Sequence, residues 1–70
     1  MSGNRLYRQV VEQISQLIES GEYAVGSRLP PERELAERFG VSRPTIREAV
    51  IALEAIGKIA VKTGSGMYVT

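Results

Sequence analysis

The chain has 70 residues, a net charge of +1 at pH 7, and no Cys or His. This length suits one small domain, and a domain of about 60 residues buries only roughly 60% of the surface that its unfolded chain exposes. Without Cys and His there are no disulfides and few ways to build a zinc or haem site, so apolar packing must hold the fold. We therefore expect no cofactor and no bound metal.

Nothing in the sequence predicts a membrane protein or a secreted one. No stretch reaches the roughly 20 apolar residues that a membrane span requires, and the N-terminus lacks the apolar block of a secretory signal. The absence of Cys fits a reducing compartment without requiring it. The expectation is a soluble, cytoplasmic protein that has no membrane partner.

The positive charge is concentrated in the C-terminal half, although the total is small. Residues 1–27 contain Arg5 and Arg8 against Glu12, Glu19 and Glu22, whereas residues 42–70 contain Arg43, Arg47, Lys58 and Lys62 against Glu48 and Glu54. Clustered positive charge attracts anionic partners such as nucleic acid. We therefore expect the binding face in the C-terminal half.

The segment 6–20 predicts an amphipathic helix that is closed by Gly21 as a left-handed cap. Its inward residues follow the three-and-four spacing of one helical face. They are Leu6, Val10, Ile14, Leu17 and Ile18, with Tyr7 and Val11 beside them. The following residues, 22–29, predict a loop that ends in a brief strand at 27–29.

A second helix is predicted to begin at the proline pair 30–31 and to run to about Phe39. Proline suits a helix start because the first turn leaves its backbone N–H groups unbonded anyway. The inward residues are predicted to be Leu35, Ala36 and Phe39, and Gly40 ends the helix.

A third helix begins almost at once after the apolar turn residue Val41. Ser42 can cap it through its hydroxyl, and Pro44 lies in its first turn. Gly57 closes it. Its predicted inner face consists of Ile46, Ala49, Val50, Leu53 and Ile56.

The apolar period then changes from about 3.6 to 2, which is typical of strands. Ile59 and Val61 alternate before the segment 64–66, and Met67 and Val69 alternate after it, so a β-hairpin is predicted. Three helices followed by this hairpin predict an α+β fold, a winged helix-turn-helix with a C-terminal β-hairpin wing.

In a helix-turn-helix the second helix of the pair enters the major groove, where each base pair presents a distinct pattern of donors and acceptors. Arg43 and Arg47 are four residues apart, so both project along one flank of that helix. A guanidinium matches O6 and N7 of guanine, which makes these two the best candidates for base contact. Ser42 and Thr45 can donate to phosphates. The alternative is that the arginines are solvated surface charges, with Arg47 satisfied by a nearby glutamate; the helix-turn-helix context favours base contact.

Other charged residues permit two interpretations. Arg33 can reach the DNA backbone, or it is a surface arginine beside Glu37. Glu48 repels phosphates, so it either orients an arginine or accepts a hydrogen bond from the amino group of a cytosine. Arg28 and Arg38 are interpreted as structural or solvent-facing.

Two further features lie near the predicted binding face. The hairpin tip, 62–66, is basic and glycine-rich, and glycine lets a backbone approach a groove closely. Ile51 points away from the apolar stripe, either as a stray exposed residue or as a contact with another domain.

The chain from Arg5 to Val69 resembles the N-terminal domain of the GntR family of bacterial regulators, particularly its FadR-like branch. The most specific elements are GSRLPPERELA, VSRPTIREAV, LEAIG and GSGMYV, in that order.

The resemblance assigns a role to particular residues. It implies that Arg33, Arg43 and Arg47 contact the operator. Neighbouring Ser42 and Thr45 match phosphate or base contacts, and Thr63 and Gly64 match a wing tip that enters the minor groove. Two prolines depart from the pattern: Pro31 stands where a capping Ser is frequent, and Pro44 removes a donor within the contact region.

The resemblance also implies partners. Such regulators bind short palindromic operators in double-stranded DNA as homodimers, and a larger C-terminal domain dimerises and senses a small-molecule effector. We therefore expect residues 1–70 to be a DNA-binding fragment without that effector domain. The opening RLY and the GEYAVG element are similar to hexuronate-responsive members, so the expected function is repression of sugar-acid or related catabolic genes.

Two alternative functions remain at the level of sequence. A winged helix can serve protein contacts, since fold alone does not determine function; steep salt dependence of duplex binding distinguishes DNA binding from this alternative. An enzyme is much less favoured, because the usual nucleophile and acid-base groups are missing.

Overall fold

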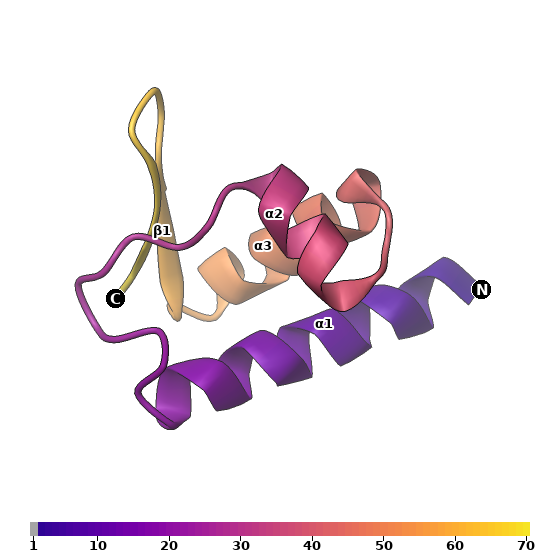
Figure 1. The fold of residues 1–70 in the computed structure, drawn as a ribbon, viewed down its shortest axis with the longest axis horizontal. Coiled ribbons are helices and arrows are strands. Elements are labelled where there is room, and N and C mark those ends of the chain that lie inside the picture. Colours follow the sequence, from indigo (N-terminus) through magenta and orange to yellow (C-terminus); the bar gives the residue numbers. More distant parts are fainter. Residues whose placement is uncertain (1) are drawn as a thin grey trace.

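The computed structural model describes residues 2–70, with side chains from Arg5 onward. Three helices precede two strands: α1 (Ser2–Glu19), α2 (Glu32–Phe39), α3 (Arg43–Ala55), β1 (Ile59–Lys62) and β2 (Gly66–Val69). Figure 1 shows α2 and α3 on one side of α1, with the hairpin of β1 and β2 projecting past the helices on the side away from α1. The predicted winged helix-turn-helix is confirmed.

Helix α1 is longer than predicted, because it begins at Ser2 and not near Leu6. Apolar periodicity marks only the turns that pack against the core, and a polar first turn needs no buried face. Leu6 was expected to face inward, but it is 43% exposed, so that expectation was wrong. Gly21 has the left-handed φ of 90° that was expected after the helix.

The starts of α2 and α3 differ in their caps. Pro31 precedes α2 and supplies no side-chain cap, whereas Gly40 closes the helix with a φ of 67°. Ser42 caps α3 through its hydroxyl, as predicted, and Pro44 lies in the first turn. Ile56 was predicted on the inner face of α3, but α3 ends at Ala55 and Ile56 is 61% exposed. The chain turns toward the hairpin there, so the helical period no longer applies.

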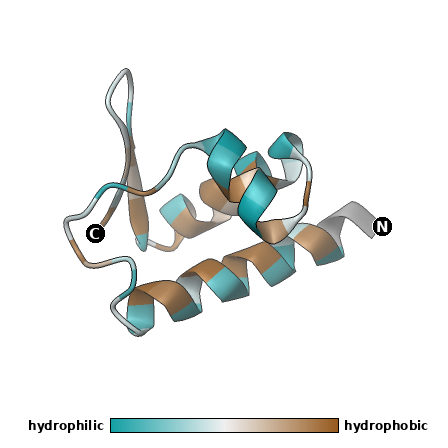
Figure 2. Cartoon of the chain, in the orientation of Figure 1, coloured by the Kyte–Doolittle hydropathy of each residue, from teal (hydrophilic) through white to brown (hydrophobic). Residues whose placement is uncertain are grey.

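The core lies where α1 meets α3, with α2 and the base of the hairpin closing it. Figure 2 shows that the apolar residues of α1 face α2 and α3. Burying a side chain such as Ile14 or Leu53 stabilises a fold by about 1.5–3 kcal/mol relative to leaving it exposed. The buried apolar residues are Val10, Ile14, Tyr23, Leu29, Leu35, Ala36, Ile46, Ala49, Val50, Leu53, Ile59 and Val69.

The hairpin is antiparallel, with Ile59 opposite Val69 and Val61 opposite Met67, as the alternation predicted. The strand expected at 27–29 is reduced to a bridge between Arg28 and Tyr68. Backbone hydrogen bonds on either side of this bridge tie the segment 26–29 (the bracing segment) to β2. None of the helices within residues 2–70 has the length and apolar character needed to cross a bilayer.

Candidate nucleic-acid interface

The side-chain hydroxyl groups of two residues hold the start of α3. The Ser42 hydroxyl accepts a hydrogen bond from the Thr45 backbone N–H at 3.3 Å. It also bonds to the Thr45 hydroxyl at 2.9 Å. Thr45 was expected to donate to phosphates, but it is only 8% exposed. Because capping occupies both hydroxyls, the first turn of α3 is held in one geometry, and Thr45 presents little surface to a partner.

Arg43 and Arg47 lie together on the exposed flank of α3, where one glutamate of α2 holds both. Arg47 donates from Nε and Nη2 to the two carboxylate oxygens of Glu32, both at 3.1 Å. Arg43 Nη2 lies 3.6 Å from Glu32 Oε1. The two arginine side chains remain 60% and 59% exposed, while the Glu32 side chain is 26% exposed. The nearby glutamate expected for Arg47 therefore exists, but it does not remove the guanidinium from solvent.

The electrostatics of this cluster are consistent with its geometry. The hydrogen bonds from Arg47 hold the pKa of the Glu32 carboxyl below its ordinary value of 4.5, and partial burial opposes that shift. The same hydrogen bonds raise the pKa of Arg47. One carboxylate facing two guanidinium groups leaves one positive charge uncompensated. The cluster thus orients its arginines and remains attractive to anions.

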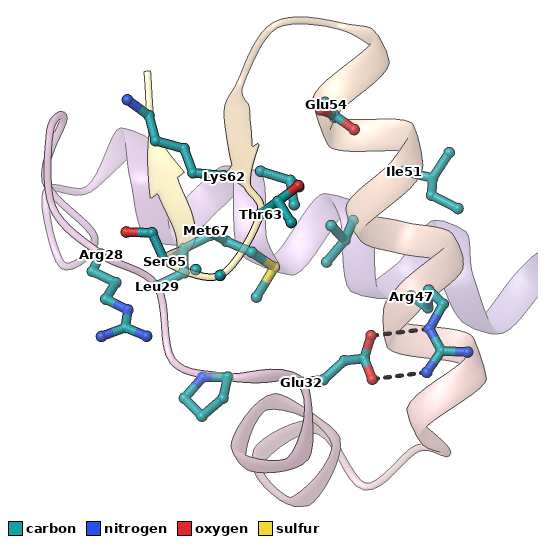
Figure 3. A pocket seen from close by; sticks show the side chains of 15 residues that line it. Arg28, Leu29, Glu32, Arg47, Ile51, Glu54, Lys62, Thr63, Ser65 and Met67 are labelled. Atoms are coloured by element: carbon teal, nitrogen blue, oxygen red, sulfur yellow. Dashed lines mark hydrogen bonds and ion pairs between the residues drawn. The ribbon is translucent and has the colours of Figure 1, made fainter.

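An open groove of about 540 Å³ separates α3 from the hairpin. Figure 3 shows Arg47 and Ile51 along its α3 side and Thr63 at the tip of the opposing hairpin. Gly64, beside Thr63, also lines it and has a φ of 77°, which favours glycine. The fold therefore brings Arg47, Thr63 and Gly64 to one concave surface.

Other predicted residues lie outside this groove. Arg33 is exposed in the first turn of α2, and Pro44 is exposed in that of α3. Neither Arg33 nor Pro44 is among the described residues that line the groove. Ile51 is exposed, as predicted.

Sequence reasoning missed the role of Glu32. The bonds between Glu32 and Arg47 join residues 15 positions apart, so no local sequence pattern indicates them. Arg28 was interpreted as structural or solvent-facing, and it has a structural placement beside the hairpin, where it pairs with Tyr68. The available signal was the predicted strand at 27–29, which has an arginine at its centre.

Arg38 has the structural role that was one of its two interpretations. It donates to the Tyr23 hydroxyl at 2.7 Å and to Glu22 at 2.8 Å. Its guanidinium also lies over the Tyr23 and Phe39 rings. The hydrogen bond to Glu22 is the main reason that the pKa of Arg38 is raised. Arg38 therefore ties the loop after α1 to the end of α2.

Within residues 2–70, no group of three His, Cys, Asp or Glu side chains is arranged to hold a metal ion.

A capped helix that exposes paired arginines beside a hairpin defines a winged helix DNA-binding domain. The family model described as "Bacterial regulatory proteins, gntR family" matches residues 6–69. The chain therefore belongs to the GntR family, and it is a DNA-binding domain of the kind found in transcription regulators.

Its relatives among known proteins are transcriptional regulators. The chain is 47% identical over 66 residues to the Uxu operon regulator of Haemophilus influenzae, covering 94% of this chain and 25% of that protein. It is 46% identical over 65 residues to the Exu regulon transcriptional regulator of Escherichia coli K12, covering 93% of this chain and 25% of that protein. The chain thus spans about a quarter of the length of these relatives.

Solved structures of the same fold include a DNA complex. The AraR DNA-binding domain in complex with an operator is 40% identical, with a TM-score of 0.88 over 93% of this chain and 78% of that one. The GntR protein of Streptococcus agalactiae is 44% identical, with a TM-score of 0.83 over 91% of this chain and 31% of that one.

Proposed function

We propose that residues 1–70 form the operator-binding domain of a transcriptional regulator that represses sugar-acid catabolic genes. The observation that carries this proposal is the exposed pair Arg43 and Arg47, held by Glu32 at the start of α3 and flanked by the hairpin. Its supporting evidence is the identity of 46–47% to regulators named for the Uxu operon and the Exu regulon.

In the proposed complex, the N-terminal turns of α3 enter the major groove. Arg43 and Arg47 bind O6 and N7 of guanine, since each guanidinium offers a planar pair of donors. Arg33, Ser42, Pro44 and Thr45 lie close to the backbone; with Thr45 buried, its contribution is to position the Ser42 hydroxyl. Thr63 and Gly64 at the hairpin tip enter the adjacent minor groove.

The proposed regulator acts as a homodimer on a palindromic operator, and a region beyond these residues binds the small-molecule effector. The relatives are far longer than this chain, which leaves room for such a region in proteins of their kind. A single copy of the domain recognises only half of a palindrome, so we expect it to bind weakly.

Selection of preferred duplexes from a random pool tests the proposal. We expect a half-site that contains guanine and an affinity that falls steeply with salt, because phosphate contacts release counterions. No sequence preference, or binding that is insensitive to salt, would contradict it. The effector is tested on the whole polypeptide that the gene encodes: addition of hexuronates should release the selected duplex, and neutral hexoses should not.

A further inference from the structure

Arg28 is held firmly against the edge of the hairpin by backbone hydrogen bonds. The Leu29 N–H donates to the Met67 carbonyl at 2.8 Å, and the Val69 N–H donates to the Ser27 carbonyl at 3.0 Å. Between these bonds, Arg28 pairs with Tyr68. The bracing segment therefore lies along the free edge of β2 like a short extra strand, and Arg28 occupies a defined position in it.

Arg28 and Lys62 lie on the same face of this sheet. Residues that pair across antiparallel strands share a face, and successive residues alternate between faces. Leu29 and Val69 are buried on the inner face, which leaves Arg28 and Tyr68 on the outer one. Lys62 pairs with Gly66, two residues before Tyr68, so it shares the outer face. Figure 3 shows the Lys62 side chain extending away from α3 and the Arg28 side chain on the far side of the hairpin from α3, although both residues also contribute to the lining of the groove.

Gly66 provides the space that the Arg28 guanidinium occupies. A Cβ atom at Gly66 would lie 2.6 Å from Arg28 Nε and 3.0 Å from Nη2. The guanidinium therefore lies flat along the hairpin, close to its tip. On the same face the Lys62 ammonium is 5.9 Å from the centre of the Tyr68 ring. The Tyr68 hydroxyl bonds to the Ser65 hydroxyl at 2.8 Å.

Neither cation on this outer face has an acidic partner among the described side chains. Ion pairs within the described side chains, 5–70, involve Arg38, Arg43, Arg47 and Lys58 but neither Arg28 nor Lys62. Two positive charges beside a pair of hydroxyl groups offer the donors that phosphate oxygens accept. The charge and the hydrogen-bond donors of this face are therefore complementary to a polyanion.

We infer that the outer face of the hairpin is a second phosphate-binding surface, in which Arg28 and Lys62 flank Tyr68. This inference rests on the proposed function. The minor groove is only about 6 Å wide, so a hairpin tip within it has a sugar-phosphate strand against each face. The inner face and α3 meet the strand between the two grooves. Arg28 and Lys62 meet the strand on the far side of the minor groove and extend the contact beyond α3.

The test is the salt dependence of duplex binding, measured by fluorescence anisotropy with the 70-residue chain. Each phosphate contact contributes about 0.9 to the slope of log affinity against log salt. Arg28→Gln and Lys62→Gln should each reduce that slope by about 1, and the double variant by about 2, equally on a selected operator and on an unrelated duplex. Arg28→Lys should retain the slope, because the charge remains.

Lys58→Gln is the matched control, since it removes the same charge from a residue paired with Glu19. Its slope should equal that of the unaltered chain. The inference is overturned if folded Arg28→Gln and Lys62→Gln both match Lys58→Gln, or if their losses depend on the duplex sequence. Failure of the unaltered chain to bind any duplex would instead overturn the proposed function, and this inference with it.

Discussion

Two clusters of arginine and glutamate in this molecule have the same chemistry and opposite consequences. Arg38 meets one carboxylate, Glu22, and is also held by the Tyr23 hydroxyl and two aromatic rings. Glu32 instead faces both Arg43 and Arg47. Both clusters are partly exposed, but the first is neutral and joins two parts of the backbone, whereas the second keeps a net positive charge. The ratio of charges and the neighbouring groups, rather than residue type, separate a structural arginine from one suited to binding.

The largest effect that this comparison predicts is on DNA affinity. Arg47→Ala should weaken binding to the selected duplex roughly tenfold to a hundredfold and abolish discrimination at one guanine, because a two-donor base contact is lost. The measurement is anisotropy on duplexes that differ at single base pairs. An equal loss on every sequence would assign Arg47 to the DNA backbone.

Arg38→Ala is the counterpart in the neutral cluster. It should lower the melting temperature by a few degrees, because two side-chain hydrogen bonds and the aromatic contacts are lost. Duplex affinity measured well below the melting transition should be unchanged. Thermal unfolding followed by circular dichroism measures the melting temperature, and anisotropy measures the duplex affinity. A loss of affinity in the folded variant would erase the distinction between the clusters.

Glu32→Gln should change duplex binding by a smaller amount than Arg47→Ala, and it tests whether the carboxylate orients the charged cluster. Without the carboxylate, the cluster gains net positive charge, but Arg43 and Arg47 lose the group that orients them both. Binding to unrelated duplexes should tighten by a few fold, with a steeper salt dependence, while the preference for the selected duplex falls.

Glu34→Gln is the control for that substitution, since Glu34 is exposed in the same helix and has no ion pair within the described residues. It removes an equal charge, so it measures the effect of net charge alone. If both variants change affinity and preference alike, Glu32 does not orient the arginines.

The smallest expected effect is on stability against pH. Because the pKa of Glu32 is lowered in the folded chain, its ion pairs stabilise the fold above the ordinary value of 4.5. That contribution is lost as the pH falls below 4.5 and through the lowered folded-state pKa. Urea unfolding of the unaltered chain and of Glu32→Gln should therefore differ most near neutral pH and converge in acid. A constant difference across this range would show that the pair does not contribute through ionisation.

The amino-acid sequence by itself determined the local elements. The three-and-four spacing of Ile46, Ala49 and Leu53 marked the buried face of α3, and the Ser42 hydroxyl marked its start. The alternation of Ile59 and Val61 marked the hairpin. These features depend on residues within a turn or two of each other, so periodicity and capping chemistry are enough to predict them.

Only the tertiary structure decided how distant residues meet. It paired Glu32 with Arg47, set Arg28 against Gly66, buried Thr45 and exposed Ile56. The physical reason is that each of these outcomes depends on the angle at which helices and hairpin pack. A one-dimensional pattern of apolar residues shows which face is buried, but it does not specify which side chain of another element lies opposite.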